Sequence, residues 1–199
     1  MAAEDSAPTR VLALLGSPRK GGNTDLLSDH VLEGAQRSGA TTQKIYLDDC
    51  RIRPIGEVCD NTREREDARD DDDFPKVLDA FLGADLIVFA TPVYWAGVSA
   101  QLKCFIDRLS SYFRRRPYSD RLEGKGYVVV TAFGREDPDH GKWVIEPLQL
   151  CVNVLNGRYL GHLSVSAYRK GQVREMSEVL KSAYELGRKA VEELSVTQE

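Results

Sequence analysis

The order in which strand-like and helix-like segments follow one another most constrains the fold of this chain. Five short segments rich in β-branched or aromatic residues are bounded by turn residues, which predicts strands over residues 10–16, 41–47, 85–91, 126–133 and 158–167. Helical periodicity predicts helices over residues 23–38, 74–82, 99–112, 142–155 and 172–194. The first, third and fourth strand segments are nearly continuous apolar runs, as in a parallel sheet that helices cover on both faces. The alternation therefore predicts a doubly wound α/β sandwich.

The length and charge of the chain limit its organisation and its partners. A chain of 199 residues with 42% hydrophobic residues suits one domain, which we expect over residues 10–194, between a flexible N-terminal tail (1–9) and a C-terminal tail (195–199). The formal net charge of −4 argues against a general nucleic-acid binder. No apolar run is long enough to span a bilayer, and the acidic N-terminal stretch MAAEDSAPTR lacks the apolar core expected of a signal peptide. We therefore expect a cytoplasmic protein with no membrane or nucleic-acid partner.

The connection between the first strand and the first helix has the chemistry of a phosphate-binding loop. It reads LLGSPRKGGNT over residues 14–24, and its glycines permit backbone conformations that other residues avoid. Ser17 and Thr24 offer hydroxyl donors and Arg19 a permanently charged guanidinium, while Asn23 or Thr24 can cap a helix whose free N–H groups attract anions. The spacing matches neither the Walker A loop of ATP-binding proteins nor the GxGxxG dinucleotide fingerprint. The alternative is a purely structural glycine-rich turn.

A second loop of interest follows the third predicted strand. The segment TPVYWAGVSAQLKCFIDR, residues 91–108, places Tyr94 and Trp95 at the same sheet edge as the first loop. Exposed rings there are suited to stacking on a flat heteroaromatic group. The alternative is that both rings pack under the next helix or in a subunit interface. Phosphate chemistry on one loop and ring chemistry on the other together indicate a mononucleotide at the switch point of a 2-1-3-4-5 sheet.

These two motifs, GSPRKGGNT and TPVYWAGVSAQLKCFIDR, resemble those of the NADPH-dependent FMN reductase family, and the similarity runs from Val11 to about Leu194. The resemblance implies a flavodoxin-like three-layer sandwich with a five-stranded parallel sheet of order 2-1-3-4-5. It implies that the FMN phosphate is bound by Ser17, Arg19, Asn23 and Thr24. It implies that the isoalloxazine and ribityl groups are flanked by Pro92, Val93, Tyr94 and Trp95. In the loop after the fourth strand it implies a contact with the ring edge for Thr131, Ala132, Phe133 and Gly134.

The chain departs from the related iron–sulfur flavoproteins in its cysteines. Those proteins carry a compact group of cysteines after the second strand, where this chain has only Cys50 and Cys59. Cys104 and Cys151 lie far away in the sequence, and an iron–sulfur cluster commonly takes four thiolates. The three histidines are also scattered. We therefore expect no iron–sulfur cluster and no metal site.

One connection has an unusual composition. After the second strand the sequence contains the acidic run EREDARDDDD, residues 64–73. We expect this run to form a solvated acidic loop. The sequence leaves its role open.

The resemblance predicts an FMN-dependent oxidoreductase that uses NADPH or NADH to reduce a small acceptor such as a flavin, quinone, nitro or azo compound. FMN itself carries this chemistry, so no catalytic side chain is required. The alternative is a flavodoxin-like electron carrier or FMN-binding module that docks a protein partner, and a third possibility is a fold that has lost its flavin. The resemblance, together with the apolar content of residues 92–106, also predicts a homodimer or homotetramer. The physiological acceptor, the preference between NADH and NADPH and the oligomeric state stay open.

Overall fold

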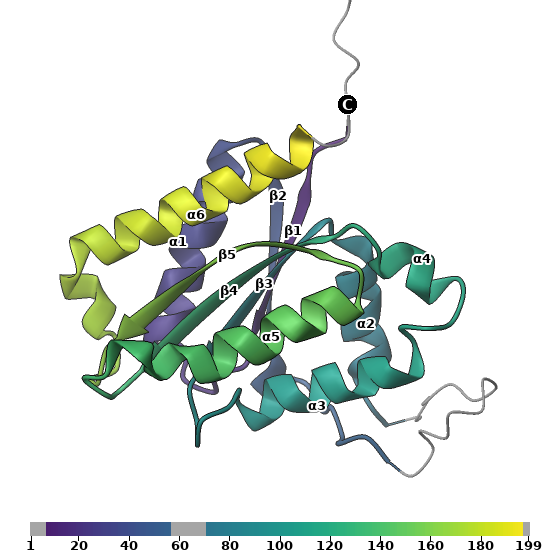
Figure 1. The fold of residues 1–199 in the computed structure, drawn as a ribbon, viewed down its shortest axis with the longest axis horizontal. Coiled ribbons are helices and arrows are strands. Elements are labelled where there is room, and N and C mark those ends of the chain that lie inside the picture. The colour runs from purple at the N-terminus through teal and green to yellow at the C-terminus, as the bar shows by residue number, and fades with distance from the viewer. Residues whose placement is uncertain (1–6, 57–70, 197–199) are drawn as a thin grey trace, which may run out of the picture.

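The computed structural model describes residues 7–56 and 71–196 and contains one five-stranded parallel sheet (Figure 1). The strands are β1 (Arg10–Leu15), β2 (Thr41–Tyr46), β3 (Leu86–Pro92), β4 (Gly126–Phe133) and β5 (Arg158–Ser166). Their order across the sheet is β2-β1-β3-β4-β5, and every neighbouring pair is parallel. The predicted sheet order is confirmed, and the switch point lies between β1 and β3.

Helices cover both faces of this sheet (Figure 1). They are α1 (Asn23–Arg37), α2 (Phe74–Gly83), α3 (Ala100–Arg108), α4 (Tyr118–Leu122), α5 (Lys142–Val154) and α6 (Ser177–Ser195). Short 3₁₀ turns are η1 (Leu47–Asp49), η2 (Leu109–Ser111), η3 (Pro138–Gly141) and η4 (Gln172–Glu175). Helices α1 and α6 pack on one face, and α2, α3 and α5 pack on the other.

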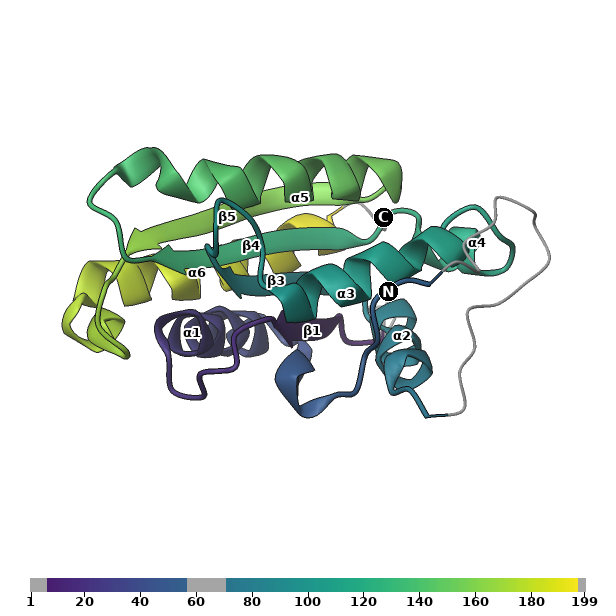
Figure 2. The ribbon, with the colours of Figure 1, turned by 90° about the horizontal axis from the view of Figure 1, so that it is seen from below.

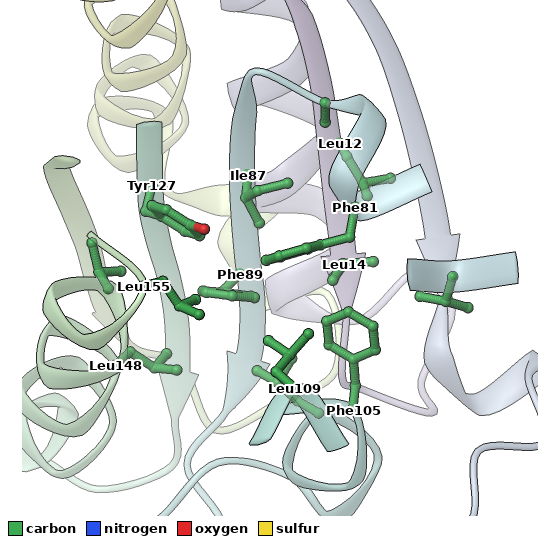
Figure 3. Close-up of a cluster of buried hydrophobic side chains, with 14 of the residues drawn as sticks. Leu12, Leu14, Phe81, Ile87, Phe89, Phe105, Leu109, Tyr127, Leu148 and Leu155 are labelled. Carbon is green, nitrogen blue, oxygen red and sulfur yellow. The ribbon is translucent and has the colours of Figure 1, made fainter. Parts of the chain in front are cut away.

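Alternation of side chains along the central strands builds a separate core on each face of the sheet. On the α2–α3–α5 face the core contains a group of aromatic rings among aliphatic side chains, and Figure 3 shows Phe81, Phe89 and Tyr127 next to one another in it. The Phe81 and Tyr127 rings both lie within 6.3 Å of the Phe89 ring, centroid to centroid. On the α1–α6 face the core is aliphatic. Burial on both faces explains why β1, β3 and β4 read as continuous apolar runs.

Close packing of α1 against α6 fixes the position of α1. A Cβ on Gly34 would lie 1.9 Å from the Tyr184 carbonyl oxygen, and a Cβ on Gly187 would lie 1.9 Å from the Val31 carbonyl oxygen. The two helices therefore meet backbone to backbone, which only glycine permits at these positions. This contact holds α1 against the sheet, so the N-terminus of α1 has a defined place beside the end of β1.

Two predicted helices differ from the observed ones. The helix predicted over residues 172–194 is interrupted at Met176, because η4 turns inward to bury Val173 before α6 begins at Ser177. The helix predicted over residues 99–112 ends at Arg108 and continues as the 3₁₀ turn η2. The short helix α4 was not predicted from the sequence. At Met176 tertiary packing decides an ending that local periodicity leaves undetermined.

The acidic run is only partly solvated. Most of it lies outside the described residues, but the Asp72 and Arg108 side chains are both fully buried and form an ion pair. The Arg108 guanidinium also lies 4.2 Å from the Phe74 ring centroid. The expectation of a solvated loop is therefore wrong for Asp72, which anchors the start of α2 to the end of α3. Among the helices of the described ranges, none is both long and apolar enough to cross a membrane.

Candidate functional site

The loops that follow β1, β3, β4 and β5 enclose a cleft of about 200 Å³ at the carboxyl edge of the sheet. Figure 2, seen from below, shows these connections gathered at the ends of the strands. The residues that line the cleft are Ser17, Arg19, Gly22, Asn23, Thr24, Pro92, Val93, Tyr94, Ala132, Phe133, Gly134, Ala167, Tyr168 and Lys170. Three loops singled out from the sequence therefore meet at one site, and a fourth loop joins them.

The β1–α1 loop forms the polar end of the cleft. A Cβ on Gly16 would lie 2.4 Å from the Ser99 hydroxyl oxygen, and a Cβ on Gly22 would lie 2.7 Å from the Arg19 carbonyl oxygen, so both positions require glycine. No side chain caps the N-terminus of α1. Its first N–H groups are therefore available to an anion, and the hydroxyls of Ser17 and Thr24 lie beside them in the cleft wall.

The Asn23 side chain makes three hydrogen bonds within the protein. Its Nδ2 donates to the carbonyl oxygens of Ala167 at 3.0 Å and Arg169 at 2.9 Å. Its Oδ1 accepts from the Val173 N–H at 3.3 Å. These three bonds tie the β5–α6 connection to the N-terminus of α1 and engage both ends of the amide. At this position the backbone N–H is the group left for an anion.

Asp25, which sequence reasoning missed, lies directly beneath this loop. Its carboxylate accepts from the Gly21 N–H at 2.6 Å and from the Tyr46 hydroxyl at 3.0 Å, and it lies 2.5 Å from the Lys44 ammonium. Burial alone would raise the pKa of Asp25, but Lys44, the Gly21 N–H and Tyr46 outweigh burial and lower it. The carboxylate is therefore ionised. The sequence signal was an acid in the first turn of a helix, which is common at helix starts and carries no information about a loop contact.

The β3–α3 loop forms a tight hairpin beside the cleft. Tyr94 and Gly97 exchange two backbone hydrogen bonds of 2.9 and 3.0 Å around Trp95 and Ala96, whose φ angles are +49° and +55°. Pro92, Val93 and Tyr94 line the cleft, but the Trp95 side chain stands at the tip of the hairpin, fully exposed to solvent and outside the lining. The structure therefore separates the two rings that the sequence predicts together.

The β4 loop contributes three of its four predicted residues. Ala132, Phe133 and Gly134 line the cleft. Thr131 does not, because its side chain is fully buried within the sheet layer, where its hydroxyl has no hydrogen-bond partner.

The fourth loop, after β5, was missed by sequence reasoning. Ala167, Tyr168 and Lys170 also line the cleft. A Cβ on Gly134 would lie 2.9 Å from Cδ2 of Tyr168, so glycine at this position lets the tyrosine stand against the β4 loop. The available signal was the position of Tyr168 immediately beyond the end of a parallel strand.

The described residues show no metal-binding constellation. Within residues 7–56 and 71–196, no three histidine, cysteine or carboxylate side chains gather where they could hold a metal ion. Cys59 lies outside the described residues. Burial raises the pKa of each of the thiols of Cys50, Cys104 and Cys151, so they are poor thiolate donors.

Comparison with known proteins identifies the family. The model of the family described as NADPH-dependent FMN reductase matches residues 9–197. The chain belongs to this family. It is thus an oxidoreductase of the FMN-dependent, NAD(P)H-using type.

Individual relatives of the reductase agree with this assignment. The Bacillus subtilis protein YwqN, whose name describes an NAD(P)H-dependent FMN-containing oxidoreductase, is 26% identical over 180 residues, which cover 89% of this chain and 96% of YwqN. An iron–sulfur flavoprotein of Methanosarcina thermophila is 31% identical over 135 residues, which cover 68% of this chain and 69% of that protein. Among solved structures, a flavodoxin, WrbA-like protein from Agrobacterium tumefaciens superposes with a TM-score of 0.63 at 18% identity, covering 95% of this chain and 98% of the other. The last comparison shows a shared fold.

Proposed function

We propose that this reductase binds FMN in the cleft with its phosphate at the N-terminus of α1. The observation that carries the proposal is that ten of the twelve residues predicted from the sequence line one cleft. Uncapped N–H groups, two hydroxyls and the Arg19 guanidinium are the donor set that a phosphate dianion requires. Gly16 and Gly22 support the same assignment, because a side chain at either position would clash with Ser99 or with the Arg19 carbonyl oxygen.

The flavin ring belongs between the loops that follow β3 and β4. Pro92, Val93 and Tyr94 form one wall, and the segment from Ala132 to Gly134 forms another. Tyr168 also lines the cleft and is largely exposed to solvent. This arrangement supports an orientation in which one face of the ring rests on the protein and the other faces solvent.

The proposed reaction is reduction of a small acceptor such as a quinone, flavin, nitro or azo compound at the expense of NAD(P)H. When bound, FMN accepts a hydride from NAD(P)H and delivers two electrons to the acceptor. The protein binds and orients NAD(P)H and the acceptor, and the exposed side chains of Tyr94 and Tyr168 offer both molecules a stacking surface. Because one open face serves both partners, they occupy it in turn. We expect parallel double-reciprocal plots when NADPH and quinone concentrations are varied, whereas intersecting lines would show that both bind together.

The phosphate assignment is tested with a matched pair of variants. Arg19 lines the cleft, whereas the adjacent Lys20 is paired with Asp49 at 2.7 Å and lies outside the lining. Arg19→Ala removes a charge-assisted contact and should weaken FMN binding by about tenfold to a hundredfold while leaving riboflavin binding unchanged. Lys20→Ala should leave both affinities unchanged. Equal FMN affinity for the Arg19 variant and the parent would refute the assignment.

The reaction itself is tested by absorption spectroscopy. Purified protein should show a flavin spectrum that bleaches when NADPH is added without oxygen. Failure to bleach, with FMN bound, would favour the alternative of an electron carrier that docks a protein partner. Protein that stays colourless after incubation with FMN would overturn both the reductase proposal and the electron-carrier alternative.

We further propose that the protein is a homodimer or homotetramer. Trp95 is fully exposed at the hairpin tip, and an apolar stripe on α5 exposes Trp143, Leu150 and Val154 by 48, 66 and 59%. Apolar side chains at this density are commonly covered by a second subunit. Light scattering should give a multiple of the 22.2 kDa chain mass, and a monomeric mass at micromolar concentration would contradict the proposal.

Two broader expectations stay proposals. Residues 10–194 are proposed to act as one domain, which limited proteolysis should leave intact. The cytoplasm is the proposed location, because scattered cysteines fit a reducing compartment and cell fractionation can test it.

A further inference from the structure

A negatively charged side chain lies where an anion is proposed to bind. Asp25 is 4% exposed and belongs to the first turn of α1, the helix whose N-terminus faces the cleft. Like charges repel more strongly in a partly buried environment than in water. A lone carboxylate here would weaken binding of a phosphate dianion, so its presence needs a physical reason.

The first part of that reason is the shape of the loop. Gly21 has a φ of +68°, and its N–H donates to Oδ2 of Asp25 at 2.6 Å. The next N–H, of Gly22, donates to the Arg19 carbonyl oxygen at 2.9 Å. Asp25 thus closes the turn that carries Arg19 and holds it in one conformation. A loop that is already ordered loses less conformational entropy when a ligand binds.

The second part is charge compensation from the neighbouring strand. Lys44 on β2 is 19% exposed at its side chain and lies 2.5 Å from Oδ1 of Asp25 and 2.5 Å from Oδ1 of Asp29. Burial alone would lower the pKa of Lys44, but its bonds with these two carboxylates and Tyr46 raise it, so the ammonium stays charged. Asp29 is half exposed, whereas Asp25 is buried, so Lys44 is the cation that offsets the buried charge.

We propose that Asp25 is a positioning residue that holds the phosphate-binding turn, and that Lys44 cancels its charge so that the turn can accept a dianion. The inference rests on the proposed function, since it concerns the phosphate end of FMN. Neither residue lines the cleft. Both therefore act through the loop and through electrostatics rather than by contact with the ligand.

A double-mutant cycle tests this division of roles. Apoprotein is titrated with FMN and, separately, with riboflavin, which lacks the phosphate, and binding is followed by quenching of flavin fluorescence. Lys44→Met exposes the dianion to an uncompensated carboxylate and should weaken FMN binding by about tenfold, with riboflavin affinity changed by less than about twofold. Asp25→Asn keeps an oxygen acceptor for the Gly21 N–H and removes the charge. Adding it to Lys44→Met should restore FMN affinity to within about threefold of wild type.

Matched variants separate this effect from a general loss of structure. Lys44→Arg retains the charge and should retain FMN affinity. Asp29→Asn removes the charge of the other carboxylate paired with Lys44. Because Asp29 is not part of the turn, this variant should also retain FMN affinity. Asp25→Ala leaves the Gly21 N–H without its acceptor and should bind FMN more weakly than Asp25→Asn, which keeps an acceptor there.

Several outcomes would overturn the inference. One is that Lys44→Met weakens FMN and riboflavin equally, which indicates a structural effect. Another is that the double variant binds FMN no better than Lys44→Met alone. Wild-type protein that binds riboflavin as tightly as FMN would instead refute the phosphate site itself, and with it this inference.

Discussion

Lys125 is a buried lysine whose cost to folding should be measurable as a function of pH. It precedes β4 at the amino-terminal edge of the sheet, far from the cleft, and is 8% exposed. Its Nζ donates to the carbonyl oxygen of Leu82 at 2.9 Å and to that of Ala84, at the C-terminal end of α2. Burial lowers the pKa of Lys125 from 10.5 to about 8, and nearby Asp85 offsets this only in part.

The sign and size of the effect follow from proton linkage. Between the folded pKa of about 8 and the ordinary value of 10.5, the unfolded chain binds more protons at Lys125 than the folded chain does. Stability therefore rises with pH across this window, and the cost of burying the ammonium is fully present below it. At about 1.4 kcal/mol for each pKa unit, the contribution of Lys125 should become less unfavourable by roughly 2–3 kcal/mol between pH 7 and pH 10.

Urea unfolding of wild type and Lys125→Met at a series of pH values measures this contribution. Other groups also contribute at the upper end of this range, because burial raises the pKa of Tyr159 in the folded chain from 10.0 to about 12, but they are common to both proteins and cancel in the difference. The stability of wild type relative to Lys125→Met should rise by the amount above. Lys181→Met, at an exposed position on α6, controls for removal of a lysine and should show no such trend. A difference between wild type and Lys125→Met that does not change with pH would refute the reasoning.

Three further predictions concern other parts of the structure. Arg108→Met leaves the buried Asp72 carboxylate without its cation and should lower the free energy of unfolding, measured by urea titration, by about 3–5 kcal/mol. The double variant in which Asp72 is also replaced by Asn should lose less stability. Gly187→Ala places a Cβ 1.9 Å from the Val31 carbonyl oxygen and should force α6 away from α1, so the Tm in thermal unfolding should fall. An unchanged Tm would contradict the close approach of the two helices. Trp95→Ala should leave FMN affinity within about twofold of wild type, because the proposed phosphate anchor is on another loop, while turnover with bulky acceptors changes. A large loss of FMN binding would place the indole in the flavin site instead.

The sheet was predictable because its strands are specified locally. β1, β3 and β4 are buried on both faces, so burial appears in the sequence as an unbroken apolar run, and the predicted bounds of β4 are those observed. The interruption at Met176 was not predictable in this way. Residues 172–175 have helical periodicity, but their geometry is set by a contact with Asn23, some 150 residues earlier in the chain.

The same distinction between local and distant contacts explains which parts of the site the sequence indicated. The glycines and donors of the β1–α1 loop are contiguous, so the loop could be read as an anion cradle. The hydrogen bonds of the Asn23 side chain could not be predicted, because an asparagine at the start of a helix is equally suited to bind a ligand, to cap the helix or to bond a distant backbone. Only the fold brings the β5–α6 connection within reach. Because the Asn23 amide is engaged there, the donors left for the proposed anion site are backbone N–H groups, the two hydroxyls and Arg19. The polar residue that looks most like a ligand in the sequence therefore joins two walls of the cleft through its side chain, and the proposed phosphate contacts fall to groups that the backbone positions.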